Sequence, residues 1–184
     1  MSDIINEKQL EDSLRQEFEQ TLKSRIKRYT SVKPHDIIPN AKFAVASSEC
    51  SLLFRDGHFY GCIALSQAVA EALVKYICEK NGWSTANNYE ENVHTLHKRG
   101  FILEELRDRL LQIWQGRDTY HHLNNSIATG IGKLEQIAQE KAKLIALIEE
   151  EVFSFSVDRE GRLIPRNPKY WEGNKGEVYL RLDR

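Results

Sequence analysis

An apolar stripe runs along the start of the chain. Its members lie four positions apart: Leu10, Leu14, Phe18, Leu22 and Ile26. Because residues four apart share one side of an α-helix, the stripe predicts a helix over about residues 4–29. The following segment, residues 32–39, holds two prolines and breaks the pattern. We therefore expect a helix followed by a linker.

The most apolar part of the chain is the segment 58–80. Its apolar residues cover most of a helical wheel, which is typical of a central, buried helix. One narrow polar stripe interrupts it, formed by Gln67, Glu71 and Lys75. Glu71 and Lys75 stand in the order that favours an ion pair four residues apart. The simpler interpretation of this stripe is a solvated helix face, and the alternative is that Gln67 and Glu71 face a cleft.

Weaker patterns predict the remaining elements. Residues 40–54 suggest a short helix that ends near Gly57, and residues 87–100 a short helix or a loop. An amphipathic helix is expected over residues 101–114, and a long one over residues 131–153. The predicted core side of the former comprises Leu103, Leu106, Leu110, Ile113 and Trp114.

The end of the chain differs from the rest. Val178, Tyr179, Leu180, Arg181 and Leu182 alternate in polarity, which predicts a short strand or hairpin. We therefore predict an all-α fold: a helical bundle over residues 1–157 and a small C-terminal tail element over residues 158–184. Aromatic side chains of this tail lie among cations, and we expect them to pack against the bundle rather than bind nucleic acid.

Composition narrows the functional classes. The chain has 184 residues, 41% hydrophobic and 29% charged, which fits one globular domain. Its net charge of −1 argues against a strongly basic nucleic-acid clamp, although a local site for one phosphate stays possible. Without a secretory signal or a long apolar run, we expect a cytoplasmic protein that does not enter the membrane.

Metal or cofactor chemistry has little support in the sequence. The three cysteines are an odd number without metal or redox spacing. His94 and His97 lie three apart, but no third ligand stands at a matching distance along the chain. We therefore expect neither a metal nor a cofactor.

Polar residues gather where the amphipathic pattern ends. They are Arg117, Asp118, Tyr120, His121, His122 and Asn124. A guanidinium can hold a phosphate through two hydrogen bonds, and an imidazole can transfer protons near neutral pH. Together these groups suffice to cleave RNA without a metal. One removes the proton of a 2′-hydroxyl, and the other stabilises the charge that develops on the phosphate.

Helix geometry decides which histidine can work with Arg117. On a continuous helix His121 shares a face with Arg117, whereas His122 lies about 140° away. His122 therefore meets Arg117 only if the helix ends or bends there. Gly116 and the run Asn124-Asn125-Ser126 favour such an ending.

The segment from Arg117 to His122 resembles the motif of the HEPN superfamily, an Arg followed after four to six residues by a His. The order of an apolar helix, an amphipathic helix, the motif and a long helix is also similar, over about residues 41–151. The resemblance implies a helical bundle that forms a homodimer, with two motifs facing each other across a cleft. Many members are metal-independent endoribonucleases, often toxins or antiviral effectors.

The resemblance also implies roles for single residues. Arg117 and His122 map onto the catalytic pair, and Asp118 takes the polar position after the Arg. His121 is a second imidazole that the minimal motif does not need, so the choice of catalytic histidine stays open. Tyr120, Asn124, Gln67 and Glu71 are candidate substrate contacts, although Tyr120 fits equally at the edge of the core.

Three functional hypotheses follow. The leading one is a HEPN-like, metal-independent endoribonuclease that acts on RNA as a homodimer, with an antitoxin or another regulatory protein as a candidate partner. The alternative is a non-catalytic HEPN-like module that binds a partner protein or a nucleotide, which the near-neutral charge supports. A third is a structural helical dimer with an exposed apolar face.

Overall fold

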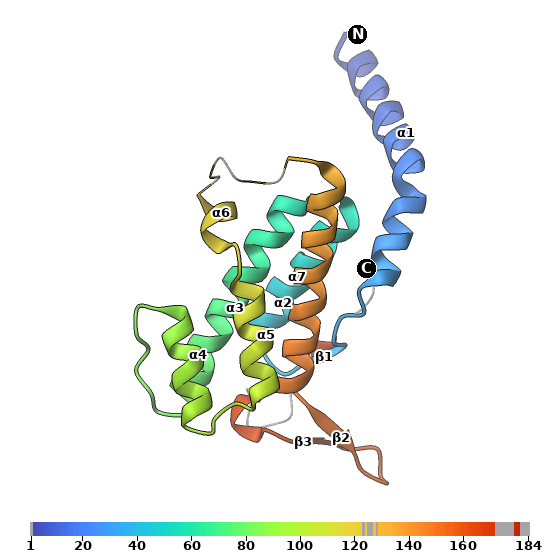
Figure 1. Cartoon of the computed structure of the whole chain (residues 1–184). Coiled ribbons are helices and arrows are strands. Elements are labelled where there is room, and N and C mark those ends of the chain that lie inside the picture. The colour runs from blue at the N-terminus through green and yellow to red at the C-terminus, as the bar shows by residue number, and fades with distance from the viewer. Residues whose placement is uncertain (1, 123, 125–126, 128, 172–178, 181–184) are drawn as a thin grey trace.

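A computed structural model describes residues 2–122, 124, 127, 129–171 and 179–180. Helices dominate it, as predicted, and the strands are short (Figure 1). The helices are α1 (Ser2–Ser31), α2 (Ala41–Asp56), α3 (Phe59–Lys80), α4 (Tyr89–Lys98), α5 (Glu104–Trp114), α6 (Arg117–His121) and α7 (Ile131–Val152), with a 3-10 turn, η1 (Pro168–Tyr170). The strands are β1 (Ile37–Ile38), β2 (Phe155–Val157), β3 (Leu163–Pro165) and β4 (Tyr179–Leu180).

Local sequence sets several helix ends. The side chain of Asn40 accepts a hydrogen bond from the backbone N–H of Phe43 and so caps the start of α2. Gly57 ends α2 with a φ of 87°, a left-handed conformation that glycine adopts without strain. Asn88 caps α4 in the same manner as Asn40 caps α2. The segment predicted as a short helix or a loop is therefore a helix, α4.

Helix α3 is the centre of the bundle. It packs against α2 and α7 along its length and also contacts α4, α5 and α6 (Figure 1). By length and composition α3 could cross a membrane, yet 61% of its apolar window is buried inside the bundle. Central burial in the bundle accounts for its apolar character, as the sequence predicted.

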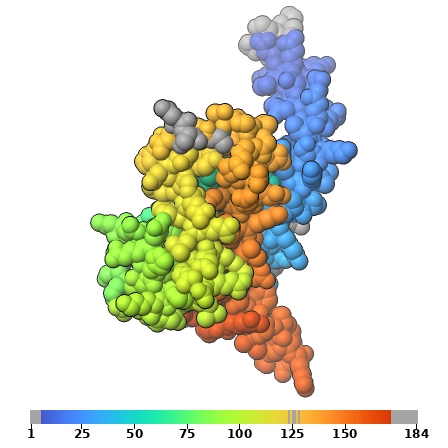
Figure 2. Space-filling model, in the orientation of Figure 1, coloured from blue at the N-terminus to red at the C-terminus, as the bar shows by residue number. Residues whose placement is uncertain are grey.

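Helix α1 extends away from the rest of the molecule. Its first turns project beyond the bundle, and only its C-terminal part lies against the body, where it contacts α2 (Figure 2). The predicted helix is present, but its apolar stripe does not join the core. The five stripe residues are 39–60% exposed: Leu10, Leu14, Phe18, Leu22 and Ile26.

The strands form two small antiparallel pairs. β2 and β3 make a hairpin directly after α7, so this element begins at Phe155, a few residues before the predicted tail. β4 pairs with β1, with Ile37 opposite Leu180 and Ile38 opposite Tyr179. The predicted alternating strand is thus described at two of its positions, while Val178, Arg181 and Leu182 lie outside the described residues.

Two further side chains test the packing predictions. Leu103 is 74% exposed, so its assignment to the core was wrong. It precedes the first turn of α5 as its N-cap residue, where the helical face no longer applies. Tyr170 is buried and its hydroxyl accepts a hydrogen bond from the side chain of Asn81, which confirms packing for this tail aromatic.

Candidate functional site

The candidate site begins where α5 ends. After Trp114 the backbone of Gln115 is extended, and Gly116 follows with a φ of 74°. A side chain at position 116 would be strained in this left-handed conformation, which explains the glycine. A turn at Gln115 and Gly116 leads into the short helix α6, which begins at Arg117.

Lys141 of α7 holds this end of α5 from inside the bundle. Its side chain reaches the carboxyl end of α5 and its Nζ donates to the carbonyl oxygens of Gln112 at 3.1 Å, Ile113 at 2.6 Å and Gln115 at 2.9 Å. The last carbonyls of a helix lack partners within the helix and carry partial negative charge, so a cation is favoured there. Burial lowers the pKa of Lys141 to about 8.

Gln67 of α3 reinforces the same helix end. Its Nε2 donates to the carbonyl oxygens of Ile113 at 3.2 Å and Gln115 at 3.3 Å. Because Gln67 is completely buried, its interpretation as part of a solvated stripe was wrong. The prediction for the rest of that stripe is confirmed, since Lys75 and Glu71 form an ion pair of 2.6 Å.

Lys141 and Gln67 together form what we call the helix-end clamp. Its two side chains come from α7 and α3 and share two acceptor carbonyls on either side of Trp114. The backbone between Ile113 and Gln115 is therefore fixed to the centre of the bundle. Since α6 begins at Arg117, two residues after Gln115, the clamp fixes the position of the first residue of α6.

Arg117 lies across this junction. Its guanidinium is 5.1 Å from the centre of the Trp114 ring, and that ring stacks on Tyr89 at 3.9 Å. Nη1 also contacts Oδ1 of Asp118 at 3.2 Å. The side chain is 34% exposed. A guanidinium that is held against an aromatic face and still reaches solvent can bind an anionic group.

His121 lies in the electrostatic field of its neighbours. Partial burial lowers its pKa, and the nearby charges of Arg117 and His122 lower it further, while Glu71 and Asp118 act in the opposite direction. The imidazole is thus favoured in its neutral form. This arrangement brings one of the predicted residues of α3, Glu71, into the same field as α6.

His122 stands just beyond the helix. α6 ends at His121, and the backbone N–H of His122 donates to the carbonyl oxygen of Asp118 at 3.3 Å. The helix therefore ends where the sequence favoured an ending. His122 is exposed, as is His121. Both imidazoles are open to solvent at the end of the bundle from which α6 projects (Figure 1).

Tyr120 and Asn124 have structural contacts within the cluster. Tyr120 packs at the edge of the core beside Tyr60, with ring centres 6.3 Å apart. Asn124 donates through Nδ2 to the carbonyl oxygen of Asp118 at 3.2 Å. Substrate contact by either residue stays a prediction, but both contribute to the shape of α6 and of the turn after it.

Glu71 lines two grooves on the surface. One has a volume of about 210 Å³ and is also lined by Tyr89 and Asn92, and the other has a volume of about 580 Å³ and is also lined by Lys75. A cavity of about 550 Å³ lies at the opposite end of α5, between Phe101, Leu106 and Tyr170. Among the described residues, no group of three or more His, Cys, Asp or Glu side chains could hold a metal ion.

Lys141 was not predicted from the sequence as part of the site. Its aliphatic stem continues the apolar stripe of the long helix α7. A lysine on an otherwise apolar helix face is itself a signal, because a buried ammonium requires acceptors. What the sequence lacks is the identity of those acceptors, which are backbone carbonyls of another helix.

Comparisons with protein-family models, with curated proteins and with solved structures find no match to this chain. The functional interpretation therefore rests on the chemistry of the residues around α6.

Proposed function

We propose that the protein is a metal-independent endoribonuclease of the HEPN type. One observation carries the proposal: the Arg117 guanidinium is held over the Trp114 ring at the start of α6, and the exposed His121 and His122 stand at the end of this short helix. A fixed cation next to a neutral imidazole is the combination that phosphodiester cleavage requires. The wider roles, as a toxin or antiviral effector in the cytoplasm and as a homodimer with paired motifs, rest on the resemblance.

The proposed reaction is an internal transfer at one phosphate of RNA. A neutral imidazole accepts the proton of the 2′-hydroxyl, and the 2′-oxygen attacks the adjacent phosphorus. Arg117 binds the phosphate and stabilises its added negative charge. The bond to the 5′-oxygen breaks, and this oxygen takes a proton from an imidazolium. The products are a 2′,3′-cyclic phosphate and a 5′-hydroxyl, so no metal and no external water enter this step.

The two histidines remain alternative bases. Partial burial and the charge of Arg117 favour the neutral form of His121, and the spacing of four residues places His121 on the same face of α6 as Arg117. The resemblance favours His122, which begins the turn after the helix. If His121 is the base, His122 becomes a positioning group or the proton donor.

The experiment is RNA cleavage in the presence of EDTA. We expect Arg117→Ala and the variant of the working histidine to lose about 100-fold or more in rate, since each removes one acid–base or charge-stabilising group. His94→Ala and Arg159→Ala, which change exposed residues outside α6, serve as matched controls with unchanged rates. Circular dichroism verifies that every variant is folded.

Product chemistry gives the sharper result. A 2′,3′-cyclic phosphate supports the mechanism, whereas a 5′-phosphate produced only with magnesium contradicts it. A wild-type protein that leaves a varied set of RNAs intact contradicts the nuclease proposal as well.

A non-catalytic binding module is the second candidate. The net charge of −1 favours it, because a nuclease that holds a long RNA benefits from a basic surface. Binding of a labelled nucleotide or RNA without cleavage, lost in Arg117→Ala, is the expected result for this candidate. Binding that Arg117→Ala leaves intact would place the binding surface elsewhere.

A further inference from the structure

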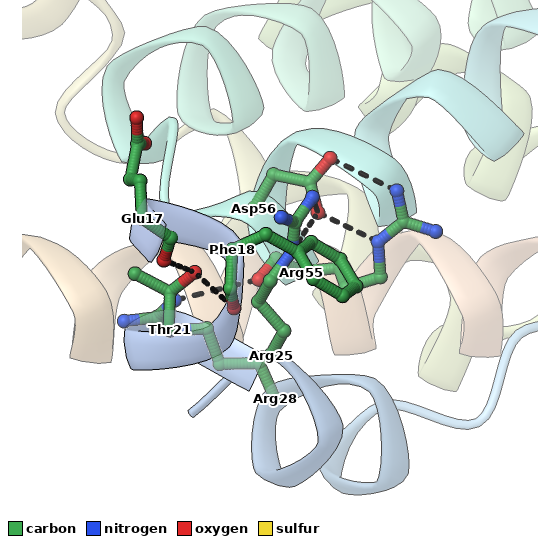
Figure 3. A network of polar contacts seen from close by, with 7 residues as sticks. All are labelled: Glu17, Phe18, Thr21, Arg25, Arg28, Arg55 and Asp56. Carbon is green, nitrogen blue, oxygen red and sulfur yellow. Dashed lines mark hydrogen bonds and ion pairs between the residues drawn. The ribbon is translucent and has the colours of Figure 1, made fainter. Parts of the chain in front are cut away.

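Helix α1 attaches to the body through its charged side. Arg25 forms an ion pair with Asp56 at 2.6 Å (Figure 3). Arg28 forms an ion pair with Glu135 at 2.9 Å. Arg28 also lies over the Phe59 ring at 5.1 Å. Hydrogen bonds from Arg55 and then Arg25 hold the pKa of Asp56 below its ordinary value.

The apolar stripe of α1 is largely exposed, because the first half of α1 projects beyond the bundle (Figure 2). In the second half, Leu22 and Ile26 follow the body-facing residues Thr21 and Arg25 by one position, about 100° around the helix, and are 39% and 55% exposed. Phe18, in the middle of the stripe, is 48% exposed although Arg25 covers part of its ring. An apolar stripe of this length on an exposed helix marks an interaction surface.

Charge divides α1 into two opposite halves. Residues 7–19 hold five carboxylates and two cations, whereas residues 20–31 hold four cations and no carboxylate. The carboxylates are Glu7, Glu11, Asp12, Glu17 and Glu19. The cations of the second half are Lys23, Arg25, Lys27 and Arg28. The charge changes sign close to Phe18, which is also the middle of the apolar stripe.

We propose that α1 pairs in antiparallel orientation with α1 of a second copy of this chain, with the two Phe18 side chains at the centre. In this arrangement the stripe is complementary to itself, because Leu14 and Leu22 lie at equal distances on either side of Phe18, as do Leu10 and Ile26. A two-fold axis through Phe18 then places Leu14 of one chain opposite Leu22 of the partner subunit.

The charges select this orientation. An antiparallel pair sets the acidic half of each helix beside Lys23 and Lys27 of the other, while Arg25 and Arg28 keep their ion pairs with Asp56 and Glu135 of their own chain. A parallel pair would set acid beside acid and base beside base, which is unfavourable. The apolar stripe is symmetric about Phe18, and the charge of α1 changes sign there. Such a surface fits a second copy of itself better than an unrelated partner.

This pairing is separate from the proposed nuclease. No candidate catalytic residue lies on α1, so RNA cleavage tests the nuclease and the α1 variants test this pairing, which is a contact distinct from the paired motifs of the proposed homodimer. Either proposal can fail while the other holds.

The first test is the mass of the full-length protein in solution, by light scattering and sedimentation over a range of concentrations. We expect a dimer at micromolar concentration. Phe18→Glu would place an unpaired charge at the centre of the seam and weaken the dimer by at least about 100-fold. Val45→Glu is the matched control, because Val45 is 71% exposed on α2, and it leaves the dimer unchanged.

A wild-type chain that stays monomeric throughout this range overturns the proposal, whichever other molecule it binds. So does a dimer that Phe18→Glu leaves intact while circular dichroism shows both proteins folded.

The second test fixes the orientation. Leu14→Cys and Leu22→Cys chains are oxidised separately and then as a mixture. The native Cys50, Cys62 and Cys78 are buried and give a low background. We expect the mixture to form far more disulfide-linked dimer than either variant alone. Stronger cross-linking of Leu14→Cys with itself would indicate a parallel pair and overturn the proposal.

Discussion

Polar side chains are usually exposed and apolar side chains buried. The interior of the bundle and helix α1 depart from this rule in opposite ways. Beneath the candidate site, the interior encloses an ammonium and an amide, those of Lys141 and Gln67. Along α1, leucine, isoleucine and phenylalanine side chains face outward. The buried donors of Lys141 and Gln67 have acceptors inside the molecule, whereas the apolar stripe is only partly covered by the described residues of this chain.

The comparison shows that burial follows available partners rather than polarity alone. Burying a polar group is costly unless hydrogen bonds replace its lost hydration. The ammonium of Lys141 and the amide nitrogen of Gln67 find those bonds at the end of α5, so they stabilise the junction from which α6 begins. The stripe on α1 points to a partner outside this chain. Three substitutions, in order of decreasing effect, test whether α1 lies outside the folded core and whether the buried polar groups stabilise the junction.

The largest effect is expected from one leucine in the core. Leu73 of α3 has no exposed surface, and Leu73→Ala should lower the free energy of unfolding by about 2–5 kcal/mol because it leaves a cavity. The same change at Leu14, which is 56% exposed, should cost less than about 0.5 kcal/mol. Urea unfolding at low protein concentration, where self-association contributes little, measures both. Equal costs would show that α1 is part of the folded core.

An intermediate effect is expected from the helix-end clamp. Lys141→Met keeps the length of the stem but removes three hydrogen bonds, so we expect a loss of about 2–3 kcal/mol in the free energy of unfolding. Lys143→Met, two positions along the same helix and exposed, is the control with almost no loss. If the two variants unfold at the same urea concentration, the clamp does not stabilise the junction.

The smallest effect is on the pH dependence of stability. Since the pKa of His121 is lower in the folded protein than its ordinary value of 6.5, the unfolded chain binds a proton first as the pH falls. Stability therefore decreases as the pH falls through about 6.5, and His121→Gln should make this decrease shallower. Urea titrations between neutral and mildly acidic pH measure it, with His94→Gln as an exposed control. If the curves for wild type and His121→Gln run parallel, the pKa of His121 is not lowered in the folded protein.

Much of the fold could be predicted because its signals are local. The spacing of apolar residues located α1, α3 and α7, and Gly57 marked the end of α2. Periodicity names the face of a helix but not what covers it, so the exposure of Leu14 could not be predicted. Leu103 shows the same limit at a helix end, where the face is no longer defined.

Less of the candidate site could be predicted. The i,i+4 spacing correctly placed Arg117 and His121 near each other, and the end of α6 followed from the glycine and asparagines around it. The acceptors of Gln67 are carbonyls of a helix far along the chain, and backbone carbonyls leave no mark in a sequence. The pairing of β1 with β4 is likewise non-local, since all of the helices after α1 lie between the two strands.

That strand pair has a consequence for the order of folding. During synthesis, every helix leaves the ribosome before β4 does, so the bundle can assemble while β1 still lacks its neighbour. Closing so long a loop is slow in comparison with local helix formation. The backbone of Ile37 and Ile38 thus acquires its strand partner last, and in the unfinished chain it presents an unpaired edge to chaperones or to other nascent chains.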